Sequence, residues 1–149
     1  SGSVVADVSG IRGNASISPQ GELVISFNVS IQGAELWSIE WPSLYKLSVS
    51  LLTAAGDVVD QIGTNFGIRK LDWDSDMGFY LNDQRVKIKG CANHQDFAGL
   101  GVAVPDSLQA HRIAKLQEVG SNGWRTAHNP PSEALLDFTD SMGMLVWVL

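Results

Sequence analysis

Two short polar segments carry residue types that could act on a substrate. They are Cys-Ala-Asn-His-Gln-Asp at residues 91–96 and Arg-Thr-Ala-His-Asn-Pro-Pro at residues 125–131. A histidine can donate to a hydroxyl group, bind a metal ion or shuttle a proton near neutral pH, and an arginine can clamp a carboxylate. The two segments therefore predict a polar binding site, provided that the fold brings them together.

The hydrophobic pattern of the second half predicts the strands that position these segments. Residues 85–89 (Arg-Val-Lys-Ile-Lys) are typical of a strand, and a polar, glycine-rich loop follows from residue 90 to residue 105. Residues 123–127 are expected to form a second, short strand. Residues 144–149 (Met-Leu-Val-Trp-Val-Leu) are apolar throughout, which fits a parallel strand buried on both faces.

Two helices are expected between these strands. Asp106 or Ser107 is the predicted cap of the first helix, and Gly120 is its stop. Ser132 is the predicted cap of the second helix, and Gly143 is its stop. Apolar residues at helical spacing give the first helix a stripe that is expected to be buried: Leu108, Ile113, Leu116 and Val119.

The order strand, helix, strand, helix, strand indicates a parallel sheet with crossover helices. In α/β barrels the functional side chains lie at the carboxyl ends of the strands. A full barrel needs roughly 250 residues, so these 149 residues hold either a small open α/β unit or the start of an unfinished barrel. The strand ends place the candidate site residues at one rim: His94, Asp96, Arg125, His128, Asn129 and Trp147.

The first half of the chain has a different pattern. Apolar and polar residues alternate along residues 23–29 and 46–51, and glycines interrupt the pattern at short intervals. Alternation predicts strands with one buried face, and several short strands with frequent turns favour an antiparallel sandwich. We expect this sandwich to occupy residues 1–75, the α/β unit to occupy residues 76–149, and no helix to begin before residue 100.

Each candidate also has a purely structural interpretation. A histidine in a loop is often a hydrogen-bonded structural group, Asp96 could cap a turn, and Arg125 could belong to an ion pair. Trp147 is expected to face the pocket because it ends a strand. The other four tryptophans are expected to pack in the core: Trp37, Trp41, Trp73 and Trp124.

Composition excludes several classes of function. The net charge is −6 and the ten lysines and arginines are scattered, so no basic stripe indicates a nucleic-acid partner. No apolar run has the length of a membrane span, which predicts that the chain has no membrane partner. The single cysteine, Cys91, excludes an internal disulfide and a thiolate zinc cluster. Neither a nucleophile elbow nor a phosphate-binding loop is present, and we predict no metal and no other cofactor.

Several segments together resemble glycoside hydrolase family 2, which includes β-galactosidases, β-glucuronidases and β-mannosidases. Residues 36–45 (Leu-Trp-Ser-Ile-Glu-Trp-Pro-Ser-Leu-Tyr) are similar to a family segment that has proline in place of Ile39. The resemblance covers nearly all of the chain from residue 36. Its further segments are Asp-Val-Val-Asp at 57–60, Phe-Gly-Ile-Arg at 66–69, Gly-Phe-Tyr-Leu-Asn at 78–82, Val-Lys-Ile-Lys-Gly at 86–90, Thr-Ala-His-Asn-Pro-Pro at 126–131 and Asp-Ser-Met-Gly-Met-Leu-Val-Trp at 140–147.

The resemblance implies an immunoglobulin-like sandwich followed by the start of a (β/α)8 barrel that cleaves β-glycosides with retention. Such enzymes use two glutamates, roughly 5–5.5 Å apart. In the family both come from later barrel strands, so we expect no catalytic residue in these 149 residues and no hydrolysis by them alone. The partners implied are the carbohydrate and the remaining part of the parent enzyme.

The resemblance also assigns supporting roles to the candidates. His94 and His128 match histidines near the sugar, and Arg125 matches an arginine that orients the nucleophile. Asp96 matches an acidic position at the rim, while Asn129 and Trp147 are expected to contact the substrate. Two departures from the family stand out: Val148-Leu149 replaces the usual acidic pair, and the family's N-terminal sugar-binding domain has no counterpart in this sequence.

Two other functions fit the residues. The chain could be a non-catalytic carbohydrate-binding or scaffold module whose sandwich binds the ligand, or a truncated product without a function of its own. An exposed edge of the parallel sheet would then promote association.

Overall fold

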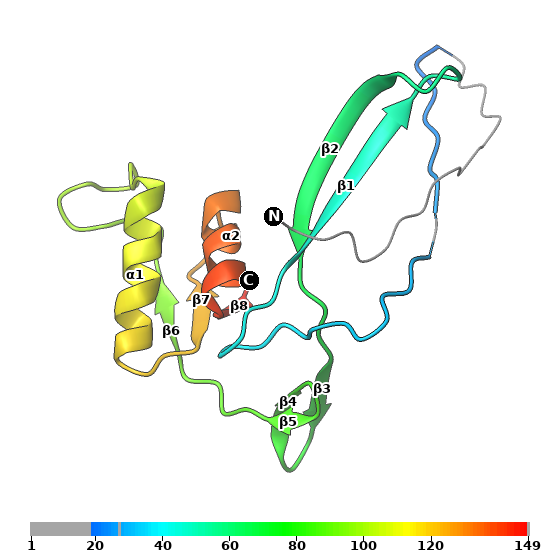
Figure 1. Ribbon diagram of the computed structural model, residues 1–149. Helices are drawn as coiled ribbons and strands as arrows, with labels where there is room; N and C mark the ends of the chain where they lie inside the picture. Colours follow the sequence, from blue (N-terminus) through cyan, green and yellow to red (C-terminus); the bar gives the residue numbers. More distant parts are fainter. Residues whose placement is uncertain (1–18, 27, 149) are drawn as a thin grey trace. The chain divides into compact units, whose positions relative to one another are not determined.

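The computed structural model describes residues 19–26 and 28–148. By its internal contacts the chain divides into two compact units, residues 1–34 and residues 35–149. All of the helices and strands among the described residues belong to the second unit (Figure 1). The first helix begins at Asp106, so the expectation of no helix before residue 100 is confirmed for the described residues.

The strand expected at residues 23–29 is not found in the described part of that segment. Residues 21–26 and 28–31 pair with no other strand, and Leu23, Val24 and Ile25 are exposed. Phe27 lies outside the described residues. Alternating residues make a strand only where a neighbouring strand completes the hydrogen-bonded ladder, and among the described residues none does so here.

Strands β1 (Tyr45–Leu52) and β2 (Val58–Phe66) form an antiparallel hairpin. The expected antiparallel arrangement of the first half is thus confirmed. The expected burial of one face is not, because Leu47, Val49 and Leu51 are 38–61% exposed. Among the described residues no second sheet packs against this hairpin, so its alternating apolar side chains remain in contact with solvent.

A second antiparallel sheet follows, in which β3 (Leu71–Asp74) pairs with β4 (Gly78–Leu81) and β4 with β5 (Gln84–Arg85). Asn82 and Asp83 join β4 to β5, and both have a left-handed backbone, with φ of 52° and 65°. Positive φ at both central residues is typical of a type I′ hairpin turn, which asparagine and aspartate tolerate.

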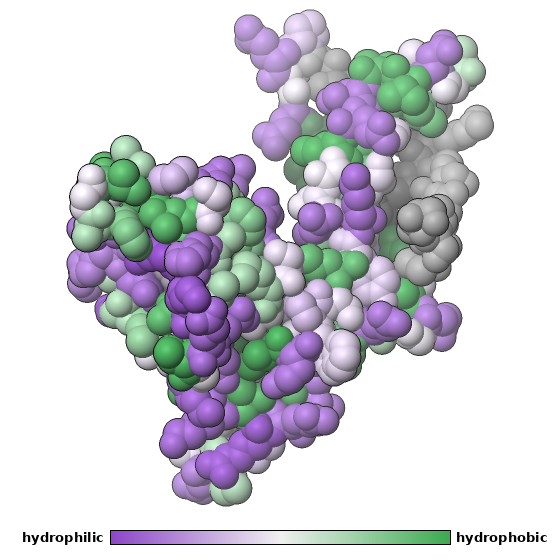
Figure 2. All heavy atoms as spheres, turned by 60° about the vertical axis from the view of Figure 1, so that its left-hand side comes forward, coloured by the Kyte–Doolittle hydropathy of each residue, from purple (hydrophilic) through white to green (hydrophobic). Residues whose placement is uncertain are grey.

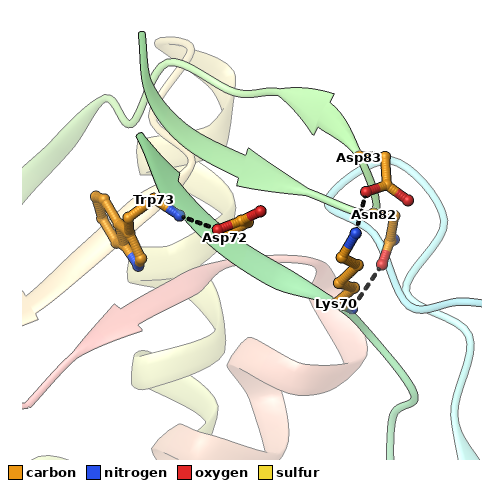
Figure 3. A network of polar contacts seen from close by, with 5 residues as sticks. All are labelled: Lys70, Asp72, Trp73, Asn82 and Asp83. Atoms are coloured by element: carbon orange, nitrogen blue, oxygen red, sulfur yellow. Dashed lines mark hydrogen bonds and ion pairs between the residues drawn. The ribbon is translucent and has the colours of Figure 1, made fainter. Parts of the chain in front are cut away.

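The side chains of this turn connect it to neighbouring segments (Figure 3). Asn82 Oδ1 accepts a hydrogen bond from the Lys70 backbone at 2.9 Å, and its Nδ2 donates to the Trp37 carbonyl at 3.0 Å. The Lys70 ammonium pairs with the Asp83 carboxylate, whose hydrogen bond raises the pKa of Lys70. Because that pair is exposed, it contributes little to stability, and Asn82 is the residue that fixes the turn.

The second half forms a parallel sheet in the order β6 (Gly90–Asn93), β7 (Gly123–Thr126), β8 (Leu145–Trp147). Helix α1 (Asp106–Glu118) connects the first two strands, and α2 (Glu133–Met142) connects the last two. The predicted order of strand, helix, strand, helix, strand is confirmed.

The position of the first parallel strand was predicted incorrectly, since it spans 90–93 rather than 85–89. Residues 87–89 are instead held by Ser121 and Asn122, and Ser121 Oγ donates to the Lys89 carbonyl at 2.9 Å. Asn122 Nδ2 donates to the Lys87 carbonyl at 3.1 Å, and Asn122 Oδ1 accepts from the Lys89 backbone at 2.7 Å. The ladder begins at Gly90, where an added Cβ would lie 2.7 Å from the Gly123 carbonyl oxygen.

The helix ends follow the sequence in part. Ser132 caps α2 by accepting a hydrogen bond from the Leu135 backbone at 3.2 Å, and Gly143 ends α2 in the left-handed conformation, as predicted. At α1 the predicted stop is confirmed, because Gly120 follows the C-cap Val119 with a positive φ of 83°, but the predicted N-cap residues are wrong. Pro105 is its N-cap residue and makes no side-chain capping bond, while Asp106 is already helical. Proline fits this position because the first N–H groups of a helix have no partner within it.

Two clusters of buried residues hold the second unit together. Ile113, Trp124, Leu135 and Met144 join both helices to β7, so α1 and α2 cover the same face of the parallel sheet. Trp37 packs with Phe79 and Leu81 in the other cluster, and Trp37 Nε1 donates to the Asp140 carbonyl at 2.7 Å.

Several apolar side chains expected to be buried are exposed. Trp41 and Trp73, expected in the core, are 76% and 60% exposed, and Val119 on the α1 stripe is 79% exposed. Trp147 and Val148 are also exposed, which contradicts the expected burial of the third strand on both faces. Among the described residues the helices cover one face of the sheet, whereas the other face is only partly covered, because Leu145 packs against the Trp37 cluster while Trp147 stays exposed. Figure 2 shows hydrophobic and hydrophilic surface intermixed.

No helix of the described part is long and apolar enough to cross a membrane.

We predict that Gly143→Ala destabilises the fold far more than Gly120→Ala. Both glycines end helices with positive φ, which costs another residue about 1–2 kcal/mol. At Gly143 a Cβ would also lie 2.1 Å from the Ile39 carbonyl oxygen, whereas Gly120 has open space. The overlap raises the expected loss at Gly143 to roughly 3–4 kcal/mol. Urea unfolding followed by tryptophan fluorescence measures both losses, and equal losses would contradict the packing argument.

Candidate functional site

The carboxyl ends of the parallel strands lie along one edge of the sheet. The register pairs Asn93 with Thr126 and Arg125 with Trp147. Parallel strands in this register end side by side, so the residues that follow them are neighbours. The loops that carry the two polar segments therefore leave the sheet at the same edge.

His94 and His128 come together at this edge. Their ring centroids lie 5.9 Å apart in an edge-to-face arrangement, and both side chains are exposed. His128 has a positive φ of 68° within a tight turn, in which its N–H donates to the Thr126 carbonyl at 3.0 Å. In the same turn Asn129 Nδ2 donates to the Ala127 carbonyl at 3.0 Å. Backbone strain of this kind clusters at functional sites.

Arg125 and Trp147 lie together on the other side of the sheet from the helices. Paired residues of neighbouring parallel strands point to the same face, and successive residues alternate. Trp124 packs against both helices, so Arg125 and its partner Trp147 face away from them. Arg125 is half-buried and Trp147 is 57% exposed.

A hollow of about 330 Å³ lies where β6 and β7 end and both helices begin. His94 and Asn129 are the sequence-predicted residues that line it, whereas Asp96, Arg125, His128 and Trp147 do not. Its floor includes Trp124 and Leu135, which belong to the core. The remaining polar groups in its wall are Asn93, Gln95, Asp106, Gln109, Thr126 and Ser132.

Sequence reasoning missed the amide groups of this wall. Asn93 ends β6, so the rule that functional side chains lie at strand ends would have selected it had the strand been placed at residues 90–93. Gln109 lies in the first part of α1, where no motif distinguishes it. The helical spacing of α1 indicates its buried face but not which polar residues approach the loop.

Asp96 lies in the loop after His94 and is exposed. Burial lowers the pKa of the Arg112 guanidinium on α1. The negative charge of the Asp96 carboxylate opposes this shift. Glu118 lies on α1, and Glu133 and Asp137 lie on α2. Within the described residues, no three histidine, cysteine or acidic side chains gather to hold a metal ion.

This arrangement can bind and polarise a ligand rich in hydroxyl groups. Two imidazoles and several amides offer both donors and acceptors, and the guanidinium of Arg125 offers a fork suited to a carboxylate. The residues at this edge are therefore suited to orient a polar substrate.

Comparison with known proteins accounts for nearly the whole chain. Residues 3–69 match the model of glycosyl hydrolases family 2, and residues 75–148 match the TIM barrel domain of the same family. The chain is 37% identical to β-galactosidase BoGH2A of Bacteroides ovatus over 84% of its own length, and 30% identical to a β-glucuronidase of Bacteroides fragilis over 90%. It spans 15% and 19% of the lengths of these relatives.

Solved structures give the same result. A β-glycosidase from Bacteroides vulgatus superposes with a TM-score of 0.76 at 35% identity, covering 79% of this chain and 15% of that one. A β-glucuronidase from Bacteroides uniformis superposes with a TM-score of 0.78 at 32% identity, covering 86% of this chain and 16% of that one. The chain belongs to glycosyl hydrolase family 2, of which it comprises the region with antiparallel sheets and the first strands and helices of the TIM barrel.

Proposed function

We propose that the chain is part of a retaining, β-galactosidase-like enzyme that hydrolyses O-glycosidic bonds. The observation that carries the proposal is the pair His94 and His128, brought to 5.9 Å at the carboxyl edge of a family 2 barrel start. Relatives named β-galactosidase and β-glucuronidase both occur among the similar proteins. The proposed division into residues 1–75 and 76–149 is supported by the two matched ranges, 3–69 and 75–148.

In this proposal the described residues bind and orient the sugar. His94 and His128 hydrogen-bond its hydroxyl groups, Asn129 and Asp96 line the rim, and Trp147 offers an exposed aromatic face. Arg125 faces away from the helices, where it would orient the nucleophile. Such groups act by placing the substrate and stabilising charge in the transition state rather than by breaking the bond.

The two glutamates of the retaining mechanism would come from strands beyond β8. From β6 to β8 the acidic residues lie on helices or in the loop after β6, and none is proposed as catalytic. The remaining part of the parent enzyme is therefore the proposed partner of this region, and the proposal needs no metal or other cofactor.

The 149-residue chain by itself is expected to hydrolyse no nitrophenyl β-galactoside or β-glucuronide, because it carries neither glutamate. Release of nitrophenol over hours at high protein concentration measures this, with a family 2 β-galactosidase as the positive control. Turnover that copurifies with the chain and is lost in the double variant Glu133→Gln, Asp137→Asn would contradict the proposal, since it would give catalytic roles to helix residues.

Sugar binding is expected at the two histidines. Titration with galactose, glucuronate and mannose should shift the imidazole NMR signals of His94 and His128 but leave those of His111 unchanged. His128→Gly removes the ring and also suits the positive φ at this position, so it is expected to weaken binding roughly three- to tenfold without loss of stability. His111→Ala is the matched control, because His111 is exposed on α1 and does not line the hollow.

The alternative function, a non-catalytic carbohydrate-binding or scaffold module, predicts a different result in the same titration. Signals from β1 and β2 would shift and the histidine signals would not. That outcome would favour the module and exclude the proposed sugar site.

The open edge of β8 is expected to promote association of the isolated chain. Edge strands expose unpaired backbone groups, and a lysine on the edge disfavours pairing with another chain. Val148→Lys should therefore reduce concentration-dependent association in sedimentation velocity. Val119→Lys is the matched control, since Val119 is also exposed but follows a helix. If the two substitutions reduce association equally, the effect comes from a general gain in solubility and the prediction about the strand edge is wrong.

A further inference from the structure

Arg112 on α1 contacts three parts of the barrel start at once. Its Nη2 donates to the His94 carbonyl at 2.9 Å, and its Nη1 lies 3.5 Å from Gln109 Oε1. Its guanidinium carbon lies 5.0 Å from the ring centroid of Trp124 and 6.0 Å from that of Phe97. One side chain thus connects the helix, strand β7 and the loop that carries His94.

The base of this contact is rigid. Trp124 is 3% exposed and packs with Ile113, which is fully buried one position after Arg112. A guanidinium over an aromatic ring is attracted by the ring's electrons when it lies within about 6 Å. Trp124 therefore offers the Arg112 guanidinium a fixed surface that belongs to the core.

The loop has few other constraints where His94 lies. Asn93 is paired in the sheet, and Phe97 closes a small turn by exchanging backbone hydrogen bonds with Gly101. Among the described residues, the bond from Arg112 is the one hydrogen bond that reaches the backbone of residues 94–96. A donor that carries a full charge makes this bond stronger than one between neutral groups.

We propose that Arg112 is a positioning residue that holds the His94 backbone, and with it the imidazole, against His128 at the rim of the sugar site. The part of this inference that concerns sugar binding rests on the proposed function. The part that concerns the position of His94 does not. Arginine suits this task better than lysine, because its planar group can lie on an aromatic ring while its edge donates hydrogen bonds.

The test compares three variants of the 149-residue chain. Arg112→Met keeps an apolar side chain over Trp124 but removes the donor, and Arg112→Lys keeps the charge without the planar group. Lys115→Met is the matched control, because it removes a cation from the same helix that pairs only with Glu118 in the described part of the chain. Each variant is measured by thermal unfolding, by the nuclear Overhauser effect between the imidazoles of His94 and His128, and by galactose titration.

The expected result is a specific loss at His94. Arg112→Met should abolish the Overhauser effect and weaken galactose binding about tenfold, whereas Lys115→Met should change neither. Arg112→Lys should keep a weaker Overhauser effect and lose less affinity. If Arg112→Met fails to fold, Arg112→Lys decides the question by the same two measurements.

Two results would overturn the inference. One is an unchanged Overhauser effect in a folded Arg112→Met, and the other is an equal loss of stability and Overhauser effect in Lys115→Met. Failure of the proposed function is distinguishable: if galactose, glucuronate and mannose do not shift the histidine signals of the unsubstituted chain, the sugar site is wrong, while the Overhauser effect still decides the role of Arg112.

Discussion

The close approach of Gly90 to Gly123 fixes the register of β6 and β7, the two strands whose ends lead to the candidate site residues. A Cβ on Gly90 would lie 2.7 Å from the Gly123 carbonyl oxygen, and a Cβ on Gly123 would lie 3.1 Å from the Ile88 side chain. With neither side chain present, β6 and β7 pair from their first residues. Asn93 then lies beside Thr126, and the loops of His94 and His128 begin at the same edge. A shift of this register by one residue would turn Arg125 toward the helices and Trp124 away from them.

A second set of contacts holds the antiparallel segments to the barrel start within residues 35–149. Trp37 is buried, donates to the Asp140 carbonyl, and lies under the Arg69 guanidinium at 5.0 Å. A Cβ on Gly67 would lie 2.9 Å from Trp37 Cβ, so the segment that follows β2 passes directly against the Trp37 side chain. Burial raises the pKa of Asp140, and Arg69 opposes that effect. The segment before β1 is thus part of the packing of α2 rather than a free linker.

Features that depend on neighbouring residues were predictable from the sequence. The serine cap and glycine stop of α2 were found because each acts within a single turn of the helix. Strand β7 and the order of parallel elements followed from hydrophobic periodicity. The start of β6 was not predictable, since Val86 and Ile88 alternate like strand residues while Asn122, distant in the sequence, bonds the backbone of Lys87 and Lys89. Arg112 was missed for the same reason, because its partners come from three separate elements.

Under the proposed function, the alternation of side chains along β7 also determines on which face of the sheet the two glutamates would act. Trp124 fills the face covered by α1 and α2, so Arg125 and Trp147 can only face away from the helices. A nucleophile that Arg125 orients must reach that face, and a sugar that contacts His94 and His128 must lie at the edge where the strands end. On that face Trp147 is 57% exposed and Arg125 is half-buried. The proposed catalytic strands would therefore cover it, and the same packing that completes the barrel would bring the glutamates to the sugar.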